Sequence, residues 1–318
     1  MLFRSDMAII DTSSEDSPFK PTTKRKEIAG VGKKTLVSLE VNKQLARSNS
    51  RSFIFMTDTL KIFEENDNKS LFFRVLIELR LFARHFLFVI DTKSSGFIRL
   101  NFALPIYTRS RRMMFDARRP MVIDNEDLEH LCEELSDISS VLTQLVPGLS
   151  IGFKEISQTL DKDGEAATVT MLTAYRDGKE LPLRDESDGV RKIISVLSLI
   201  IAAFNEQSVT VAIDEFDAGI FEYLLGEILQ SMEESGKGQF IFTSHNLRPL
   251  EVINKKFLYF TTTNPQNRYI RLKNISATNN LRDTYFREII LCEQEEEIYN
   301  KTKKFKIIAA LKKAGGLR

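Results

Sequence analysis

Two apolar runs separated by a helical pattern constrain the fold of this chain most strongly. The first run is Val209–Ile213 and the second is Phe240–Thr243. Between them, apolar residues recur at helical spacing, at Phe221, Leu224, Leu225, Ile228, Leu229 and Met232. A strand, a helix and a second strand, with both strands apolar, predict a right-handed parallel βαβ unit. The chain is therefore expected to contain a parallel sheet.

Polar residues follow both predicted strands at the point where each one ends. Asp214 and Glu215 come directly after the first strand, Asp217 follows two places later, and His245 lies beyond the second strand. The carboxyl ends of parallel strands open onto one sheet edge, where ligands of open α/β sheets bind. We therefore expect Asp214, Glu215 and His245 to converge there.

This set of side chains suits phosphate chemistry. Asp214 can hold a magnesium ion, because Mg²⁺ needs only one or two carboxylates beside water and phosphate oxygens. Glu215 can orient and deprotonate an attacking water, and His245 can contact a γ-phosphate. The alternatives are a helix N-cap for the acidic pair and a satisfied core position for the histidine. The order and spacing of the three signals favour the phosphate interpretation.

A second informative stretch precedes the acidic strand end. An apolar helical stripe starts directly after Ser187, Asp188 and Gly189, and it contains Val190, Ile193, Ile194, Leu197, Ile200, Ile201 and Phe204. Unpaired N–H groups and the positive dipole end make a helix start an anion site, and glycine lets a phosphate approach closely. A plain Ser/Asp N-cap is the commoner use of such residues. Both interpretations stay open for Ser187 and Gly189.

The rest of the chain predicts a mixed α/β protein. We expect a poorly ordered polar and basic segment over residues 1–34, an α+β lobe over 35–120 and an ATPase-like half over 121–318. The expected strands and hairpins are Thr35–Val41, Ser52–Met56, Phe86–Ile90, Gly96–Phe102, and a meander over 149–183 that turns at Asp163-Gly164 and Asp177-Gly178. Helices are expected at Leu71 onward, at Leu128–Leu145, and twice within the charged C-terminal stretch from Cys292 to Gly316.

Composition excludes several classes. The chain has 318 residues and 42% hydrophobic content, enough for a real core, and its net charge of +1 gives no global preference for nucleic acid or membrane. Charges interrupt the apolar stretch Leu71–Ile90, so we expect no membrane span, and two distant cysteines fit a reducing cytoplasm. The N-terminus lacks a secretory signal, so cytoplasmic residence is expected. The arginines of Arg109–Pro120 favour a solvated face, with nucleic-acid binding as the alternative.

At this point the motifs resemble a known family. The segment from Arg184 to Asn246 is similar to the C-terminal half of an ABC-type ATPase head. It resembles most the SMC-like and OLD-like bacterial AAA-family ATPases, many of which are phage-defence components. "ESDGVRK" resembles their signature motif at Ser187 and Gly189, "VTVAIDE" the Walker B strand, "FDAG" the D-loop at Asp217 and "TSHN" the switch histidine. The resemblance implies a P-loop NTPase-like mixed sheet flanked by helices.

The resemblance also implies a mechanism. In this family ATP, with Mg²⁺, is held between the phosphate loop and Walker B of one head and the signature motif of another. Ser187 would then act in trans, and the partner would be a second copy or a related subunit. Nucleotide binding would drive head engagement and hydrolysis release, a switch that acts on a partner or on DNA.

One family element has no match in the sequence. The phosphate loop G-x-x-x-x-G-K-[ST] does not occur in these residues. The run Gly30–Thr35 resembles its end, but Glu27 stands where the first glycine belongs and an extra lysine, Lys34, precedes Thr35. Basic surface is the favoured interpretation of that run. We expect the loop to come from an N-terminal segment outside these residues or from a partner. The alternative is a non-hydrolytic scaffold derived from such an ATPase, against which the retained Ser187, Gly189, acidic pair and His245 argue.

Overall fold

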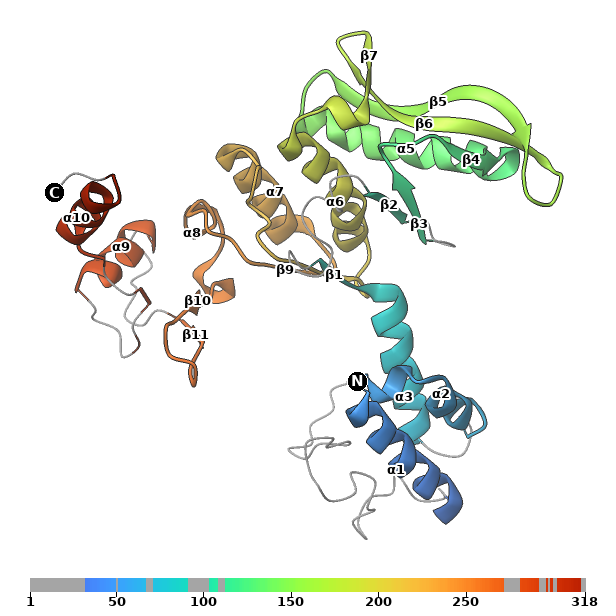
Figure 1. Ribbon diagram of the computed structural model, residues 1–318, viewed down its shortest axis with the longest axis horizontal. Helices are drawn as coiled ribbons and strands as arrows, with labels where there is room; N and C mark the ends of the chain where they lie inside the picture. The colour runs from blue at the N-terminus through green and yellow to red at the C-terminus, as the bar shows by residue number, and fades with distance from the viewer. Residues whose placement is uncertain are drawn as a thin grey trace. The chain divides into compact units, whose positions relative to one another are not determined.

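The structure, a computed structural model, forms two compact units, Met1–Phe88 and Val89–Arg318. It describes residues 32–49, 51–66, 71–90, 103–107, 112–271, 281–291, 296, 298–299 and 302–315 (Figure 1). This division falls elsewhere than the boundary expected after residue 120. Residues 1–31 of the expected polar segment lie outside the described residues, whereas Lys33 and Lys34 open the first helix.

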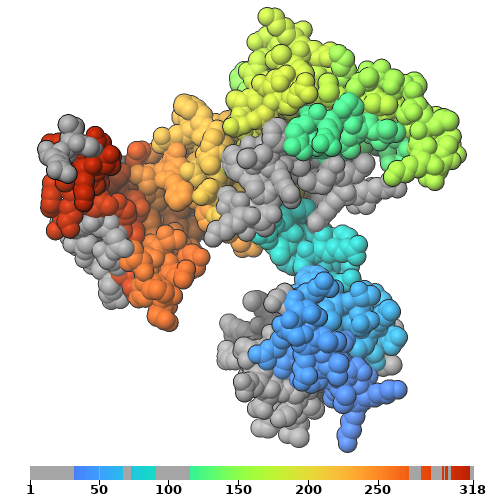
Figure 2. Space-filling model, viewed as in Figure 1, coloured from blue at the N-terminus to red at the C-terminus, as the bar shows by residue number. Residues whose placement is uncertain are grey.

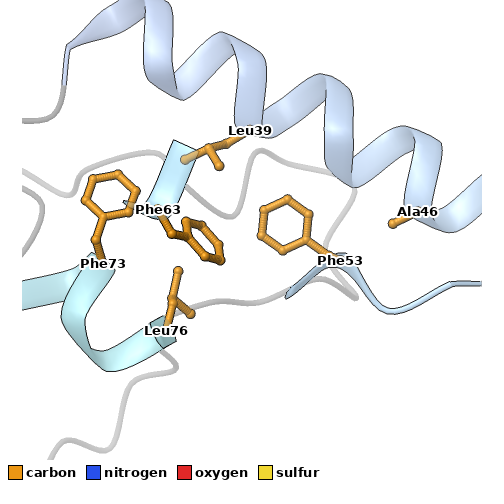
Figure 3. Close-up of a cluster of buried hydrophobic side chains, with 6 residues drawn as sticks. All are labelled: Leu39, Ala46, Phe53, Phe63, Phe73 and Leu76. Atoms are coloured by element: carbon orange, nitrogen blue, oxygen red, sulfur yellow. The ribbon is translucent and has the colours of Figure 1, made fainter. Parts of the chain in front are cut away.

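The described residues of the first unit form mainly helices, up to the start of a strand at Leu87. The unit contains α1 (Lys33–Ser48), the 3₁₀ turn η2 (Phe53–Phe55), α2 (Thr57–Glu64), α3 (Leu71–Leu81) and the π-helical turn η3 (Phe82–Phe86). Its core is a cluster of buried side chains (Figure 3): Leu39, Ala46, Phe53, Phe63, Phe73 and Leu76. The ring of Phe63 lies 6.2 Å from that of Phe53 and 5.8 Å from that of Phe73, so this unit is held by apolar packing.

The strands predicted in this unit are wrong. Thr35–Val41 lies within α1, and Ser52–Met56 contains the 3₁₀ turn. In α1 the buried positions Leu39 and Ala46 share a face with Leu36, whereas Val37 and Val41 are exposed. A stripe spaced by three and four residues packs against the aromatic rings, and this packing overrides the local β-branched alternation.

The predicted helix running into a strand is confirmed at Leu71–Ile90. The helix α3 continues through the π-helical turn into β1 (Leu87–Ile90). Within the described residues, no helix is long and apolar enough to cross a bilayer. The strand predicted at Gly96–Phe102 lies outside the described residues, as do Arg109 and Arg111.

The second unit contains antiparallel pairings that build its long hairpins (Figure 1). β2 (Ala103–Tyr107) pairs with β3 (Arg112–Asp116), and a separate sheet has the order β4-β6-β5 with β7 paired to β6. The bounds of that sheet are β4 (Met121–Asp124), β5 (Leu149–Leu160), β6 (Ala166–Arg176) and β7 (Lys179–Pro182). Gly164, Asp177 and Gly178 have positive φ at the turns, so the predicted meander is confirmed.

One long helix precedes the meander and another joins the meander to the parallel sheet. The predicted helix after Pro120 is α5 (Asn125–Leu145), which lies against β5, and the Ser139 hydroxyl donates to Ile151 O at 2.7 Å. The next helix, α6 (Asp188–Asn205), contacts α5, β2, β8 and β9. It therefore carries the segment that begins at Ser187 to the edge of the parallel sheet.

The predicted parallel strand pair is confirmed. β8 (Thr210–Ile213) and β9 (Gln239–Phe242) are parallel neighbours in a sheet of order β1-β8-β9, with α7 (Glu222–Ser235) between them in the chain. Val211 and Ile213 are buried, and the ring of Phe216 lies 5.2 Å from that of Phe240. The protein is thus a mixed α/β structure with parallel and antiparallel sheets flanked by helices.

Smaller elements follow β9. They are α8 (Pro249–Val252), η5 (Lys255–Phe257), β10 (Phe260–Thr261), β11 (Tyr269–Ile270), α9 (Leu281–Leu291) and α10 (Lys304–Ala314). β10 and β11 pair as an antiparallel hairpin. The second of the two predicted C-terminal helices corresponds to α10. The first falls largely on residues outside the described ranges.

Candidate functional site

Asp214 and Glu215 open the loop after β8, and Thr243 holds both of them. The Thr243 hydroxyl donates to Asp214 Oδ1 and accepts from the Glu215 backbone N at 2.8 Å. The backbone N of Phe216 donates to Thr243 O at 3.0 Å. Glu215 has a φ of 50°, a conformation that costs energy for a side chain other than glycine. The ends of the two parallel strands therefore lie together, as the sequence predicts.

His245 faces Glu215 at this edge. Its Nε2 lies 3.8 Å from Glu215 Oε1, an ion pair whenever the imidazole is protonated. The His245 side chain is 87% exposed and that of Glu215 43% exposed. The histidine is therefore a surface side chain beside the acid, which rules out the alternative of a satisfied core position.

Asp217 organises the loop after β9. Its carboxylate accepts from the backbone N of His245, at 3.2 Å to each oxygen, and from the backbone N of Asn246 at 2.9 Å. These bonds tie the loop after one strand to the loop after its neighbour. Asp217 thus sets the position of His245 relative to Glu215.

Ser187 and Gly189 lie at the first turn of α6, beside the same loop. The Ser187 hydroxyl accepts from the backbone N of Val190 at 3.3 Å, so Ser187 is the N-cap of α6. A Cβ at Gly189 would lie only 2.0 Å from Gly219 O, and Gly219 has a φ of 78°. Packing within the chain therefore requires glycine at 189. A role for either residue toward nucleotide stays a prediction.

Lys192, one turn further along α6, was missed by sequence reasoning. It is 1% exposed, and its Nζ donates to Glu215 O at 2.5 Å and to Ala218 O at 2.9 Å. Burial lowers the pKa of Lys192 to about 8, while Asp217 and Glu215 oppose that shift. The sequence signal that could have indicated it is a lysine within the apolar stripe of a helix. Its contacts fix the backbone on both sides of Asp217.

The site has a donor set suited to a hard cation that keeps its waters. Among the residues that the structure describes, no group of three or more His, Cys, Asp or Glu side chains is placed to hold a metal ion. Asp214, held by the Thr243 hydroxyl, can supply one carboxylate ligand, with water and phosphate oxygens completing the shell. Asp214 could therefore hold a Mg²⁺ ion that a phosphate ligand brings with it.

Residues 105–251 match an AAA family model. Its description is "AAA domain, putative AbiEii toxin, Type IV TA system". The matched range contains all six predicted site residues, Ser187, Gly189, Asp214, Glu215, Asp217 and His245. The match supports an AAA-type ATPase relationship for this segment of the chain.

A solved structure also aligns with part of the chain. It is entitled "Crystal structure of the SmcHead bound to the C-winged helix domain of ScpA". The alignment has 17% identity and a TM-score of 0.30, and covers 39% of this chain and 36% of that chain. This likeness is too weak to support a functional argument. Among curated proteins, none matches this chain.

Proposed function

We propose that this protein is an ABC-type ATPase head that holds its own nucleotide at the edge formed by the ends of β8 and β9 and presents the start of α6 to the nucleotide of a second head. One observation carries the proposal. The loop from Asp214 to Gly219 is held on one side by Thr243 and on the other by Lys192 and Gly189. The acidic pair, His245 and the signature-like helix start therefore form one connected assembly rather than separate caps.

Each residue has a proposed role at this edge. Asp214 holds Mg²⁺ through its carboxylate, and Glu215 orients and deprotonates the attacking water. His245 contacts the γ-phosphate from the end of the neighbouring strand, and the Asp217 carboxylate positions His245 by accepting from the His245 backbone N–H. Ser187 and Gly189 serve a nucleotide held by a second head. When bound, Mg-ATP supplies the phosphoryl group that is transferred to water.

Lys192 is a proposed positioning residue. Its bond to Glu215 O helps to hold Glu215 in its positive-φ conformation, and its bond to Ala218 O closes the same loop onto α6. A shift of the α6 start on contact with a second head would therefore be passed to the catalytic glutamate. This gives head engagement a physical route to the hydrolytic residue.

The same proposal includes a switch driven by ATP-dependent dimerisation. ATP binding favours an engaged dimer, with a second copy or a related subunit, and hydrolysis releases it, which is a population shift driven by differential affinity. The switch acts on a protein partner or on DNA in the cytoplasm. The phage-defence role rests on the resemblance to family members of that kind.

The test is Glu215→Gln in protein purified from its native source, where any phosphate-loop segment or partner is present. We expect the variant to lose Mg-ATP hydrolysis and to accumulate a nucleotide-dependent dimer, because the ligands stay while the base is lost. Glu234→Gln, an exposed acid on α7, is the control and should leave turnover unchanged. Unchanged turnover in Glu215→Gln would remove Glu215 from the mechanism.

A non-hydrolytic scaffold is the second candidate, favoured by the lack of G-x-x-x-x-G-K-[ST] in the 318 residues. Thermal unfolding with and without Mg-ATP separates the two. A ligand at a hundred times its dissociation constant adds about 2.7 kcal/mol to the unfolding free energy. The ATPase head shows this gain and a scaffold without a nucleotide site does not.

A further inference from the structure

The β10–β11 hairpin lies in a part of the chain that does not contribute to the proposed nucleotide site at the ends of β8 and β9. One of its faces is half-buried and the other is exposed. Phe260 and its cross-strand partner Ile270 are half-buried, and the Phe260 ring stacks on Tyr285 of α9 with centroids 5.4 Å apart. Side chains alternate between the faces of a strand, so the residues on either side of this pair face outward. The exposed residues on that outer face are Tyr259, Thr261, Tyr269 and Arg271.

The outer face exposes aromatic rings. Tyr259 is 59% exposed and Tyr269 67% exposed, and Phe257, two residues before Tyr259, is 58% exposed. In Figure 2 the orange atoms of this region lie on the visible surface. Rings of this size are normally buried, and a group of exposed ones marks a site of interaction. We call Lys255–Tyr259 together with Arg268–Arg271 the hairpin surface.

Cations lie directly beside the rings. The Arg271 guanidinium carbon is 4.6 Å from the Tyr259 ring centroid, and Lys256 Nζ is 4.6 Å from that of Phe257. Lys255 and Arg268, in the same two segments, are also exposed. The sequence has no Asp or Glu from Val252 to Arg282. The hairpin surface therefore carries four positive charges and no negative charge of its own.

Among the residues that the structure describes, two carboxylates bond to asparagines at the borders of this surface. Glu233 of α7 accepts from the Asn254 backbone N at 2.9 Å. Glu296 accepts from the side-chain amides of Asn264 and Asn267, at 2.8 and 3.0 Å, at the hairpin turn. Both acids bond to asparagines rather than to the cations of the hairpin surface. Arg271 Nη2 donates to the Tyr259 hydroxyl at 2.6 Å, which holds the guanidinium beside the ring on this surface.

We propose that the hairpin surface binds single-stranded nucleic acid. Unpaired bases stack on exposed tyrosine and phenylalanine rings, while lysine and arginine face the phosphates, and this pairing of groups is how proteins hold single strands without sequence preference. A duplex keeps its bases stacked on one another and offers no base face to these rings. This site is separate from the nucleotide edge and needs no ATP.

The experiment measures fluorescence anisotropy of labelled oligo(dT) and oligo(rU) with the full chain. We expect binding that weakens with salt, with a slope of log K against log salt of roughly −2 to −3 for three or four phosphate contacts. Tyr259→Ala and Tyr269→Ala should each weaken binding about tenfold through lost stacking. Unequal affinities for the two oligonucleotides tell whether DNA or RNA is preferred.

The matched control is Tyr223→Ala. Tyr223 is 60% exposed with the Arg248 guanidinium carbon 5.6 Å from its ring centroid, but Arg248 is paired with Glu251 at 2.8 Å. This variant should bind as the wild type does. Absence of binding, a preference for duplex, or equal binding of heparin with unaffected Tyr259 and Tyr269 variants would overturn the proposal. Each of these results leaves the Glu215 test of ATP hydrolysis intact.

Discussion

Different interactions stabilise the core of the first, helical unit and the loop at the carboxyl ends of β8 and β9, which we call the strand edge. In the first unit, Phe53, Phe63 and Phe73 pack ring against ring with Leu39 and Leu76 around them. At the strand edge, the loop from Asp214 to Gly219 is held by hydrogen bonds from Thr243 and Lys192. Apolar packing is not directional, whereas hydrogen bonds fix particular atoms. The comparison teaches that the aromatic core stabilises the first unit, whereas the hydrogen bonds at the strand edge fix the positions of the candidate site residues.

The largest expected effect tests the packed side of this comparison. Phe63→Ala removes a fully buried ring and should lower the unfolding free energy of the first unit by about 3–5 kcal/mol. Hydrogen exchange by mass spectrometry should show the loss over the helices of residues 32–88, with the strand edge unchanged. Phe55→Ala is the control, because Phe55 is 48% exposed, and it should cost much less. Equal losses in the two variants would contradict a core centred on Phe63.

A smaller effect tests the close approach at the strand edge. Gly189→Ala places a Cβ where Gly219 O lies 2.0 Å away, so one of the two backbones must move. We expect a loss of about 1–3 kcal/mol, typical of overpacking, and faster exchange in the loop after Glu215. Gly32→Ala serves as the comparison, since no atom lies within 4 Å of its added Cβ. A neutral Gly189→Ala variant would show that the two segments are not held together.

The pH dependence of stability tests the hydrogen-bonded side. Lys192 has a pKa lowered to about 8, so the folded state binds fewer protons than the unfolded state between that pH and about 10.5. Stability should rise with pH across this window, by about 2 kcal/mol between roughly pH 7 and 9.5. Urea unfolding should show this rise in the wild type and lose it in Lys192→Met. Lys237→Met, at an exposed position, should retain it. If the unfolding free energy changed with pH in the same way in the wild type and in Lys192→Met, the pKa of Lys192 would not be lowered by folding.

Sequence patterns predicted the strand edge well because its elements are strongly marked. The run Val209–Ile213 ends in two acids, and the helix and strand that follow have clear periods of their own. The parallel pairing of β8 and β9 then brings His245 to Glu215 through topology alone. Only the directions of parallel strands were needed for that inference.

Tertiary contacts account for what the patterns could not show. Thr35–Val41 alternates like a strand, but Leu39 and Ala46 pack against distant phenylalanines and select a helix. The contacts of Lys192 and Thr243 join segments more than twenty residues apart, so no local spacing signals them. The sequence leaves two interpretations open for Gly189, and neither of them signals the close contact with Gly219 O that the structure shows.

The central claim is that Glu215 is the hydrolytic base of a head that engages a second head through ATP. Light scattering after size exclusion, on Glu215→Gln protein from the native source with and without Mg-ATP, tests it most directly. The account predicts that the mass rises to that of a dimer, or of a complex with a related subunit, only when Mg-ATP is present. The same mass in both conditions, together with wild-type turnover, would contradict it.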